Sequence, residues 1–158
     1  MAMGDRQQAK VLRLAEEQLG RPVLGAAIVT RPRRGVGAAS FGAVGALVQT
    51  AVASRRTIPV DFAAFNLFVV TEDALHVFEL GGATSSRVRS TIGSWPWESF
   101  GAWVEGRGMT RDLILVWDDG AAAKLQAPVK GNQKFQQAVL DQIVHRTAVA
   151  QDGGPVLG

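Results

Sequence analysis

The pattern of apolar and polar positions predicts an amphipathic helix at the start of the chain, followed by a strand. Residues 5–19 place apolar side chains on adjoining helical faces, Asp5 can cap the first turn, and Gly20 and Pro22 end the helix. The apolar run Val23–Thr30 has prolines on both sides. Breakers at both ends favour a buried strand over a helix.

Two hairpins are predicted from apolar runs that flank short polar turns. In Phe65–Leu80, apolar residues alternate on both sides of a Thr-Glu-Asp turn, as expected for a strand pair. Leu113–Trp117 and Ala122–Gln126 flank Asp119–Gly120, a favoured hairpin turn because glycine accepts positive φ.

Further elements are expected between and after the hairpins. Strands are predicted around Arg87–Ile92 and from Phe100 to Val104, and Pro96 prevents a regular helix or central strand from running through the aromatic segment that separates them. An apolar stripe at helical spacing predicts a helix over residues 132–148, with Asn132 as its N-cap.

The stretch from Arg31 to Arg56 is basic at both ends, and residues 35–54 between them carry no charge. Small residues recur there every four positions, which lets another helix approach closely. The length allows a membrane span, but six larger apolar residues contribute only about −3 kcal/mol on insertion scales. Three interpretations remain open: a helix or helical hairpin packed on its own domain or on a copy of itself, a membrane-associated segment, or a flexible loop.

Two sets of candidate contact residues come from this stretch. The self-association or membrane-contact set is Ala38, Phe41, Gly42, Val44, Gly45, Ala46, Val48 and Val52. The anion or lipid-headgroup set is Arg31, Arg33, Arg34, Arg55 and Arg56.

Composition narrows the classes of function. The chain has 158 residues, of which 47% are hydrophobic and 20% charged, so it fits one ordinary domain. The absence of cysteine excludes disulfides, thiol nucleophiles and thiolate metal sites, and it fits a reducing cytosol. The net charge is +3, which favours phosphate, anionic lipid or acidic protein partners. We expect a bacterial protein that is cytoplasmic or peripheral at the inner face of the membrane.

Residues with catalytic potential have simpler structural interpretations. His76 is expected on the surface of a strand, and His145 near a helix C-terminus, where the dipole favours positive charge. Glu72–Asp73 and Asp118–Asp119 are explained by hairpin turns, and no metal-ligand spacing occurs. The serines at 85, 86, 90 and 94 have no nearby His and no G-x-S-x-G context. No catalytic residue, metal or cofactor is therefore expected.

The tryptophans Trp95, Trp97, Trp103 and Trp117 are candidates for a partner surface or the lining of a cavity. Core packing is the favoured interpretation because Trp fills gaps between a sheet and a helix. Nearby Arg107 and Arg111 also suit stacking on single-stranded nucleic acid, which is the least favoured.

The order of elements resembles the pleckstrin-homology-like (PH-like) fold, in its bacterial PH/GRAM-like branch. The segments that carry the resemblance are NLFVVTEDALHVFEL, WPWESFGAWVEGRG, LILVWDDGAAAKLQAP and NQKFQQAVLDQIV, with Val23–Thr30 as an additional strand. It implies a strongly bent antiparallel sheet, plugged at one end by the C-terminal helix, in a binding module without catalysis. Lipid-binding members carry Lys and Arg between their first two strands, whereas the Thr-Glu-Asp turn here is acidic and the next loop offers only Arg87 and Arg89.

The sequence thus predicts an α+β chain. Its expected parts are an N-terminal helix at 1–22, a first strand within 23–34, a Gly/Ala-rich helical insertion at 35–56, a PH-like domain at 57–148 and a flexible tail at 149–158. The expected function is a non-catalytic binding or scaffold module that self-associates, or contacts a membrane or protein partner, through the Gly/Ala-rich segment. The alternative is a small-molecule carrier or enzyme that uses an aromatic-lined cavity of the bent sheet, formed by Trp97, Phe100, Trp103 and Trp117.

Overall fold

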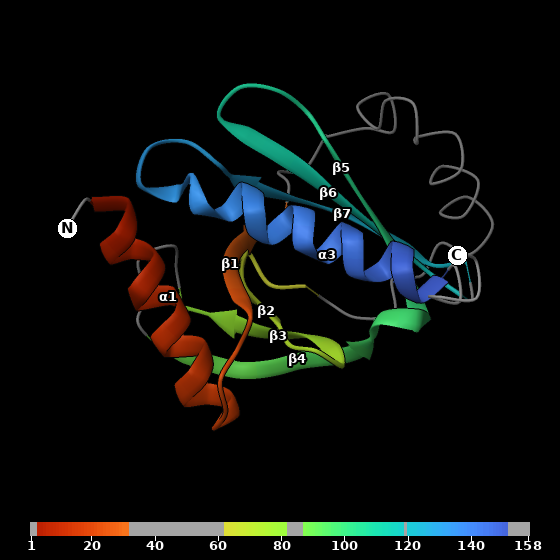
Figure 1. The fold of residues 1–158 in the computed structure, drawn as a ribbon, viewed down its shortest axis with the longest axis horizontal. Helices are drawn as coiled ribbons and strands as arrows, with labels where there is room; N and C mark the ends of the chain where they lie inside the picture. Colours follow the sequence, from red (N-terminus) through yellow and green to blue (C-terminus); the bar gives the residue numbers. More distant parts are fainter. Residues whose placement is uncertain (1–2, 32–61, 82–86, 119, 152–158) are drawn as a thin grey trace.

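A computed structural model describes residues 3–31, 62–81, 87–118 and 120–151 (Figure 1). The elements in chain order are α1 (Met3–Leu19), β1 (Gly25–Thr30), β2 (Phe65–Val70), β3 (Ala74–Leu80), β4 (Val88–Pro96), the 3-10 helix η2 (Trp97–Ser99), β5 (Phe100–Glu105), β6 (Thr110–Trp117), β7 (Ala122–Pro128), the 3-10 helix η3 (Gly131–Gln133) and α3 (Phe135–Gln151). The α+β class, with a helix near each end of the chain, is confirmed. The last helix continues to Gln151, past the boundary expected at residue 148.

The strands form one antiparallel sheet in the order β4-β3-β2-β1-β7-β6-β5. The first strand pairs with β2 along its whole length, but it pairs with β7 only at Thr30, opposite Gln126. The two halves of the sheet therefore meet at a corner and run in different directions in Figure 1. The run Val23–Thr30, expected as an additional strand, supplies the central strand that joins them.

Two apolar clusters stabilise this arrangement. The larger cluster lies inside the bend, where side chains from both halves of the sheet pack against α3. The smaller cluster lies on the outer face, where Val11 and Ala15 of α1 pack with apolar side chains of β1, β2 and β3. Both faces of β2 are thus covered, which explains why its sequence FNLFVV is apolar at nearly every position.

The corner is closed by the side chain of Gln136, in the first turn of α3, which is fully buried. Its Oε1 accepts a hydrogen bond from the Ile28 backbone N–H at 2.7 Å, and its Nε2 donates to the Pro128 carbonyl at 2.6 Å. These two backbone groups lie where β1 and β7 no longer pair, so the carboxamide supplies the partners that a strand would otherwise provide.

The expected N-cap at Asn132 was wrong. This residue lies within η3, which has no side-chain cap, and α3 begins only at Phe135. Gly131 adopts a positive φ of 66°, and its carbonyl accepts a hydrogen bond from the Lys134 N–H at 3.3 Å. The backbone therefore tightens into a 3-10 turn before the helix, and this turn takes the place of a side-chain cap.

Replacing Gln136 with Met should lower the free energy of unfolding by about 2–6 kcal/mol, because each of two buried backbone groups loses its partner at about 1–3 kcal/mol. Urea denaturation measures the loss. The matched control is Gln137→Met, since Gln137 bonds only the exposed Asp141 and leaves its Oε1 without a partner. Equal losses in the two variants would contradict the assigned role.

Candidate functional site

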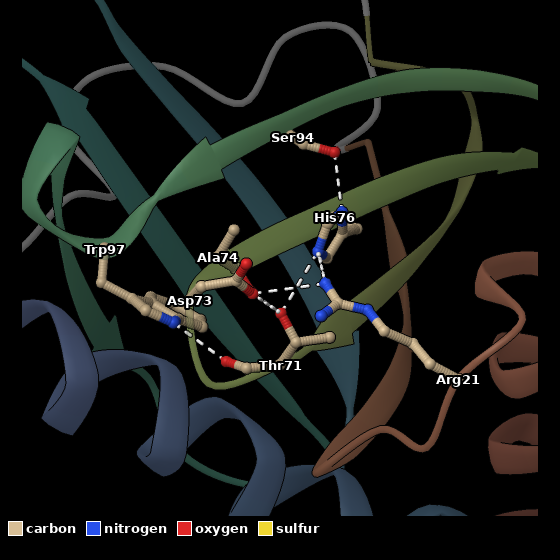
Figure 2. Close-up of polar contacts among 7 residues, drawn as sticks. All are labelled: Arg21, Thr71, Asp73, Ala74, His76, Ser94 and Trp97. Atoms are coloured by element: carbon tan, nitrogen blue, oxygen red, sulfur yellow. Dashed lines mark hydrogen bonds and ion pairs between the residues drawn. The ribbon is translucent and has the colours of Figure 1, made fainter.

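Polar side chains from four parts of the chain converge at the end of the sheet that carries the β2–β3 turn. Figure 2 shows Arg21 from the α1–β1 connection, Thr71 and Asp73 from the β2–β3 turn, His76 from β3 and Ser94 from β4. We call these five residues the His76 network.

The network is a chain of hydrogen bonds centred on the imidazole. His76 and Ser94 are opposite each other in the β3–β4 ladder, and the Ser94 Oγ lies 2.7 Å from the His76 Nδ1. On the other side of the ring, Nε2 lies 3.2 Å from the Thr71 Oγ1. That hydroxyl is 2.7 Å from the Asp73 Oδ1, so a continuous path runs from Ser94 to the carboxylate.

The hydrogen bond from Thr71 to Asp73 favours one tautomer of His76. An ionised carboxylate only accepts, so the Thr71 hydroxyl donates its single proton toward Asp73 and the neighbouring Ala74 carbonyl, which lies 3.0 Å away. Its oxygen is then free to accept from an imidazole proton on Nε2, whereas Arg21, which only donates and lies 3.4 Å from the same nitrogen, favours the proton on Nδ1. In the Nε2–H tautomer, Nδ1 is an acceptor and the Ser94 hydroxyl donates to it.

Arg21 adds a positive charge beside the ring. Its Nη2 lies 3.3 Å from the Asp73 Oδ1 and 3.4 Å from the His76 Nε2. Burial lowers the pKa of His76 below its usual 6.5, and the charge of Arg21 lowers it further against the opposing effect of Asp73. The hydrogen bond from Thr71 is the main cause that lowers the pKa of Asp73 below 3.8. Near neutral pH the network therefore holds a neutral imidazole beside an ionised carboxylate.

Such a neutral imidazole can take a proton from the Ser94 hydroxyl, which is the first requirement of a serine nucleophile. The expectation that no serine has a nearby His was wrong for Ser94. The two residues are 18 positions apart, and β3 and β4 shift register twice before they meet. Strand alternation does place His76 at a half-exposed position, as expected, but no signal in the sequence specifies its partner on β4.

The β2–β3 turn also borders an open depression. Trp97 donates its Nε1–H to the Thr71 carbonyl at 3.0 Å, which ties η2 to the turn. The depression has a volume of about 490 Å³, and its lining includes Glu72, Asp73, Trp97, Glu98, His145 and Arg146. Carboxylates outnumber cations there, so this end of the sheet is acidic.

The four tryptophans do not form one surface. Trp97 and Trp117 are buried in the larger cluster together with Phe100, and Trp95 makes an edge contact with Trp117 at 5.6 Å between centroids. Trp103 is 36% exposed on the outer side of β5, and its ring covers Gly101. Core packing is confirmed for Trp97 and Trp117, while Trp103 lies away from the set it was grouped with.

Arg31 is the one member of the predicted anion-contact set that lies among the described residues. Its backbone N–H donates to the Ala64 carbonyl at 3.2 Å, and its Nη1 donates to the Phe62 carbonyl at 3.0 Å. The other predicted contacts lie outside the described residues: Arg33, Arg34, Arg55, Arg56, Ala38, Phe41, Gly42, Val44, Gly45, Ala46, Val48 and Val52. Arg31 thus holds together the two ends of the connection that contains them.

The connection between the first two strands was assigned wrongly from the sequence. Since β1 pairs with β2, that connection is residues 31–64, and the acidic Thr-Glu-Asp turn joins the second and third strands.

No protein-family model matches this chain, and no curated protein has significant sequence similarity to it. In the part of the chain that the structure describes, no helix is both long and apolar enough to cross a membrane.

The stability of the fold should depend on pH through His76. Its folded pKa lies below the unfolded value of 6.5, so the unfolded chain binds a proton first as the pH falls. The stabilisation is complete above 6.5 and is lost as the pH falls through the folded pKa. Urea denaturation from about pH 8 to about pH 5 should show this loss, with a smaller loss in His76→Gln.

The matched control for this variant is His145→Gln, on the exposed side of α3. An identical pH dependence in wild type and His76→Gln would contradict the proposed linkage. ¹⁵N chemical shifts of the imidazole should also report a proton on Nε2 at neutral pH, and a proton on Nδ1 would contradict the hydrogen-bond assignment.

Proposed function

We propose that the chain is a PH-like, non-catalytic binding module that docks on an anionic membrane surface through the end of the sheet where the β1–β2 connection begins. One observation carries this proposal: the strand order assigns residues 31–64, with Arg31 at their base, to the connection between the first two strands. Lipid-binding members of the fold that the sequence resembles carry their basic residues in that connection.

The architecture supports the PH-like part of the proposal. The resemblance implies a strongly bent antiparallel sheet with a C-terminal helix at one end. The seven-stranded sheet bends at β1, and α3 packs against β5, β1 and η2. The central position of β1 also gives the run Val23–Thr30 a place within the same domain.

Electrostatics supports the choice of partner. Arg33 and Arg34 follow Arg31 after Pro32 in the sequence, and Arg55 and Arg56 lie in the same connection. Each basic residue near an anionic membrane surface contributes about 1 kcal/mol of attraction, so a few of them suffice for reversible binding. Self-association or protein contact through residues 35–54 stays a prediction that does not conflict with this role.

Co-sedimentation of the intact chain with vesicles tests the proposal. We expect binding to phosphatidylcholine vesicles that contain about 20% phosphatidylserine, and a large loss as salt rises from about 0.05 M to about 0.5 M. Replacing Arg33 and Arg34 with Gln should weaken binding by about 25-fold, while Arg13→Gln, on the exposed side of α1, should change it by less than the fivefold expected per membrane-facing charge. Equal binding to neutral vesicles would contradict the proposal.

A second candidate function is hydrolysis of an activated ester at Ser94. The 2.7 Å contact between the Ser94 Oγ and the His76 Nδ1 favours it, because Nδ1 can accept the hydroxyl proton when the ring proton is on Nε2. In this reaction the serine oxygen attacks the carbonyl, His76 accepts the hydroxyl proton, and the leaving alcohol takes that proton as the acyl–enzyme forms; water then releases the acid.

A fluorophosphonate probe separates the two functions. If Ser94 is a nucleophile, its oxygen displaces fluoride, and mass spectrometry finds the phosphonyl adduct on wild type but not on Ser94→Ala or His76→Gln. The binding-module proposal expects no adduct at Ser94, and it also expects Ser94→Ala to bind anionic vesicles as wild type does. An adduct that depends on His76 would replace the non-catalytic assignment.

A further inference from the structure

The register of the sheet brings several connections to the same end. Thr30 of β1 is paired with Phe65 of β2 on one side and with Gln126 of β7 on the other. Gln126 is paired with Asp112 of β6, and Asp112 is paired with Glu105 of β5. This row crosses the bend without interruption. The β1–β2 connection and the β5–β6 turn therefore leave the sheet beyond the same row of residues.

Charge is distributed unevenly between this end and the opposite one. The cations beyond the row, or next to it, include Arg31, Arg87, Arg89, Arg107, Arg111 and Lys130. Of the carboxylates there, Asp112 is paired with Lys124 at 3.5 Å, Glu79 accepts a hydrogen bond from Ser90 at 2.9 Å, and Glu105 is half-buried. The opposite end carries Glu72, Asp73, Glu98 and Asp118, with Arg21, His145 and Arg146 among them. The first end is thus basic, and the end with the His76 network is acidic.

The β5–β6 turn, residues 106–109, presents an apolar side chain at the basic end. Gly106 and Gly108 adopt positive φ angles of 108° and 82°, which shape the tight turn. Met109 is 63% exposed, more than Leu24, Trp103 or Val149, the other exposed large apolar residues described. Transfer of an exposed thioether side chain from water into an apolar environment is favourable.

Three cations belong to the β5–β6 turn or to the segment bonded to it: Arg107, Arg111 and Lys130. Arg107 precedes Met109 in the turn and is exposed. The Nη1 of Arg111 donates to the Gly108 and Thr110 carbonyls at 3.2 and 3.0 Å, so its guanidinium lies against the turn. The Val129 N–H donates to the Met109 carbonyl at 2.9 Å, which brings the neighbouring, exposed Lys130 to the same place.

We propose that the β5–β6 turn docks on an anionic lipid bilayer, with Met109 inserted among the headgroups and with Arg107, Arg111 and Lys130 against the lipid phosphates. This inference rests on the proposed membrane function and adds a second contact to it. An exposed apolar side chain on a turn that also carries cations matches the two layers of a membrane interface, where charge lies above hydrocarbon. Nucleic acid or an acidic protein surface would complement the charge but would leave Met109 in water.

An environment-sensitive fluorophore tests the insertion directly. The chain has no cysteine, so the intact Met109→Cys variant can be labelled at one position with nitrobenzoxadiazole. Vesicles of phosphatidylcholine with about 20% phosphatidylserine should shift its emission to the blue and raise its intensity. The same label on Leu24→Cys, an exposed apolar position just before β1 at the opposite end, should not respond. A water-like spectrum at position 109 on bound vesicles overturns the proposal.

Equilibrium binding tests the energetic part. Arg107→Gln should weaken binding by about fivefold, as expected for one cation at the surface, and Met109→Ser by about tenfold. The control Leu24→Ser, 45% exposed in the free chain, should bind as wild type does. Thermal unfolding of each variant verifies that the fold is intact.

The outcomes separate this inference from the function it rests on. In one outcome, wild type binds the anionic vesicles, the Arg33→Gln/Arg34→Gln variant binds them more weakly, and the Arg107→Gln/Met109→Ser variant binds them as wild type does. The membrane function then stands, and the β5–β6 contact is overturned. If wild type does not bind at low salt, both are overturned. Loss of binding in both variants, with a blue-shifted label at position 109, supports both.

Discussion

The buried carboxamide of Gln136 is the contact on which the two halves of the sheet depend. A central strand that bends away from one neighbour leaves backbone groups without partners, and each such group in an apolar interior costs about 1–3 kcal/mol. Gln136 satisfies one group on β1 and one at the end of β7, and it does so from α3, which also fills the bend. The same side chain therefore closes the corner of the sheet and fixes the position of α3.

On the other side of β1, Asn66 plays a comparable part. Its Nδ2 donates to the Val29 and Ala63 carbonyls at 3.0 and 2.8 Å, and its Oδ1 accepts from the Ala63 N–H at 2.9 Å. These bonds fix the chain just before β2 and keep Phe62 inside the larger cluster, where its ring stacks on Phe68. Two buried amides thus hold the central strand from both sides, although amide residues give no periodic signal in a sequence.

Local patterns predicted the elements well because each depends on residues close in the chain. The Asp-Gly turn, the breakers around β1 and the apolar stripe of α3 are all of this kind. Long-range register was not predictable, since it depends on packing between distant segments. The central position of β1, the pairing of Ser94 with His76 and the closure at Gln136 all require partners 18 or more residues away. For the same reason, the sequence alone assigned the first two strands to the wrong hairpin.

The bonds between Arg31 and the segment at Phe62 and Ala64 also bear on how this molecule can change over evolutionary time. They complete the β1–β2 ladder before the chain leaves the sheet, so the connection begins and ends at neighbouring points on two paired strands. Lengthening a connection between two such points costs little chain entropy, about 0.6 kcal/mol of free energy for each doubling of its length. Selection is then free to lengthen, shorten or recompose residues 32–61 for a particular partner while the domain beneath keeps its stability.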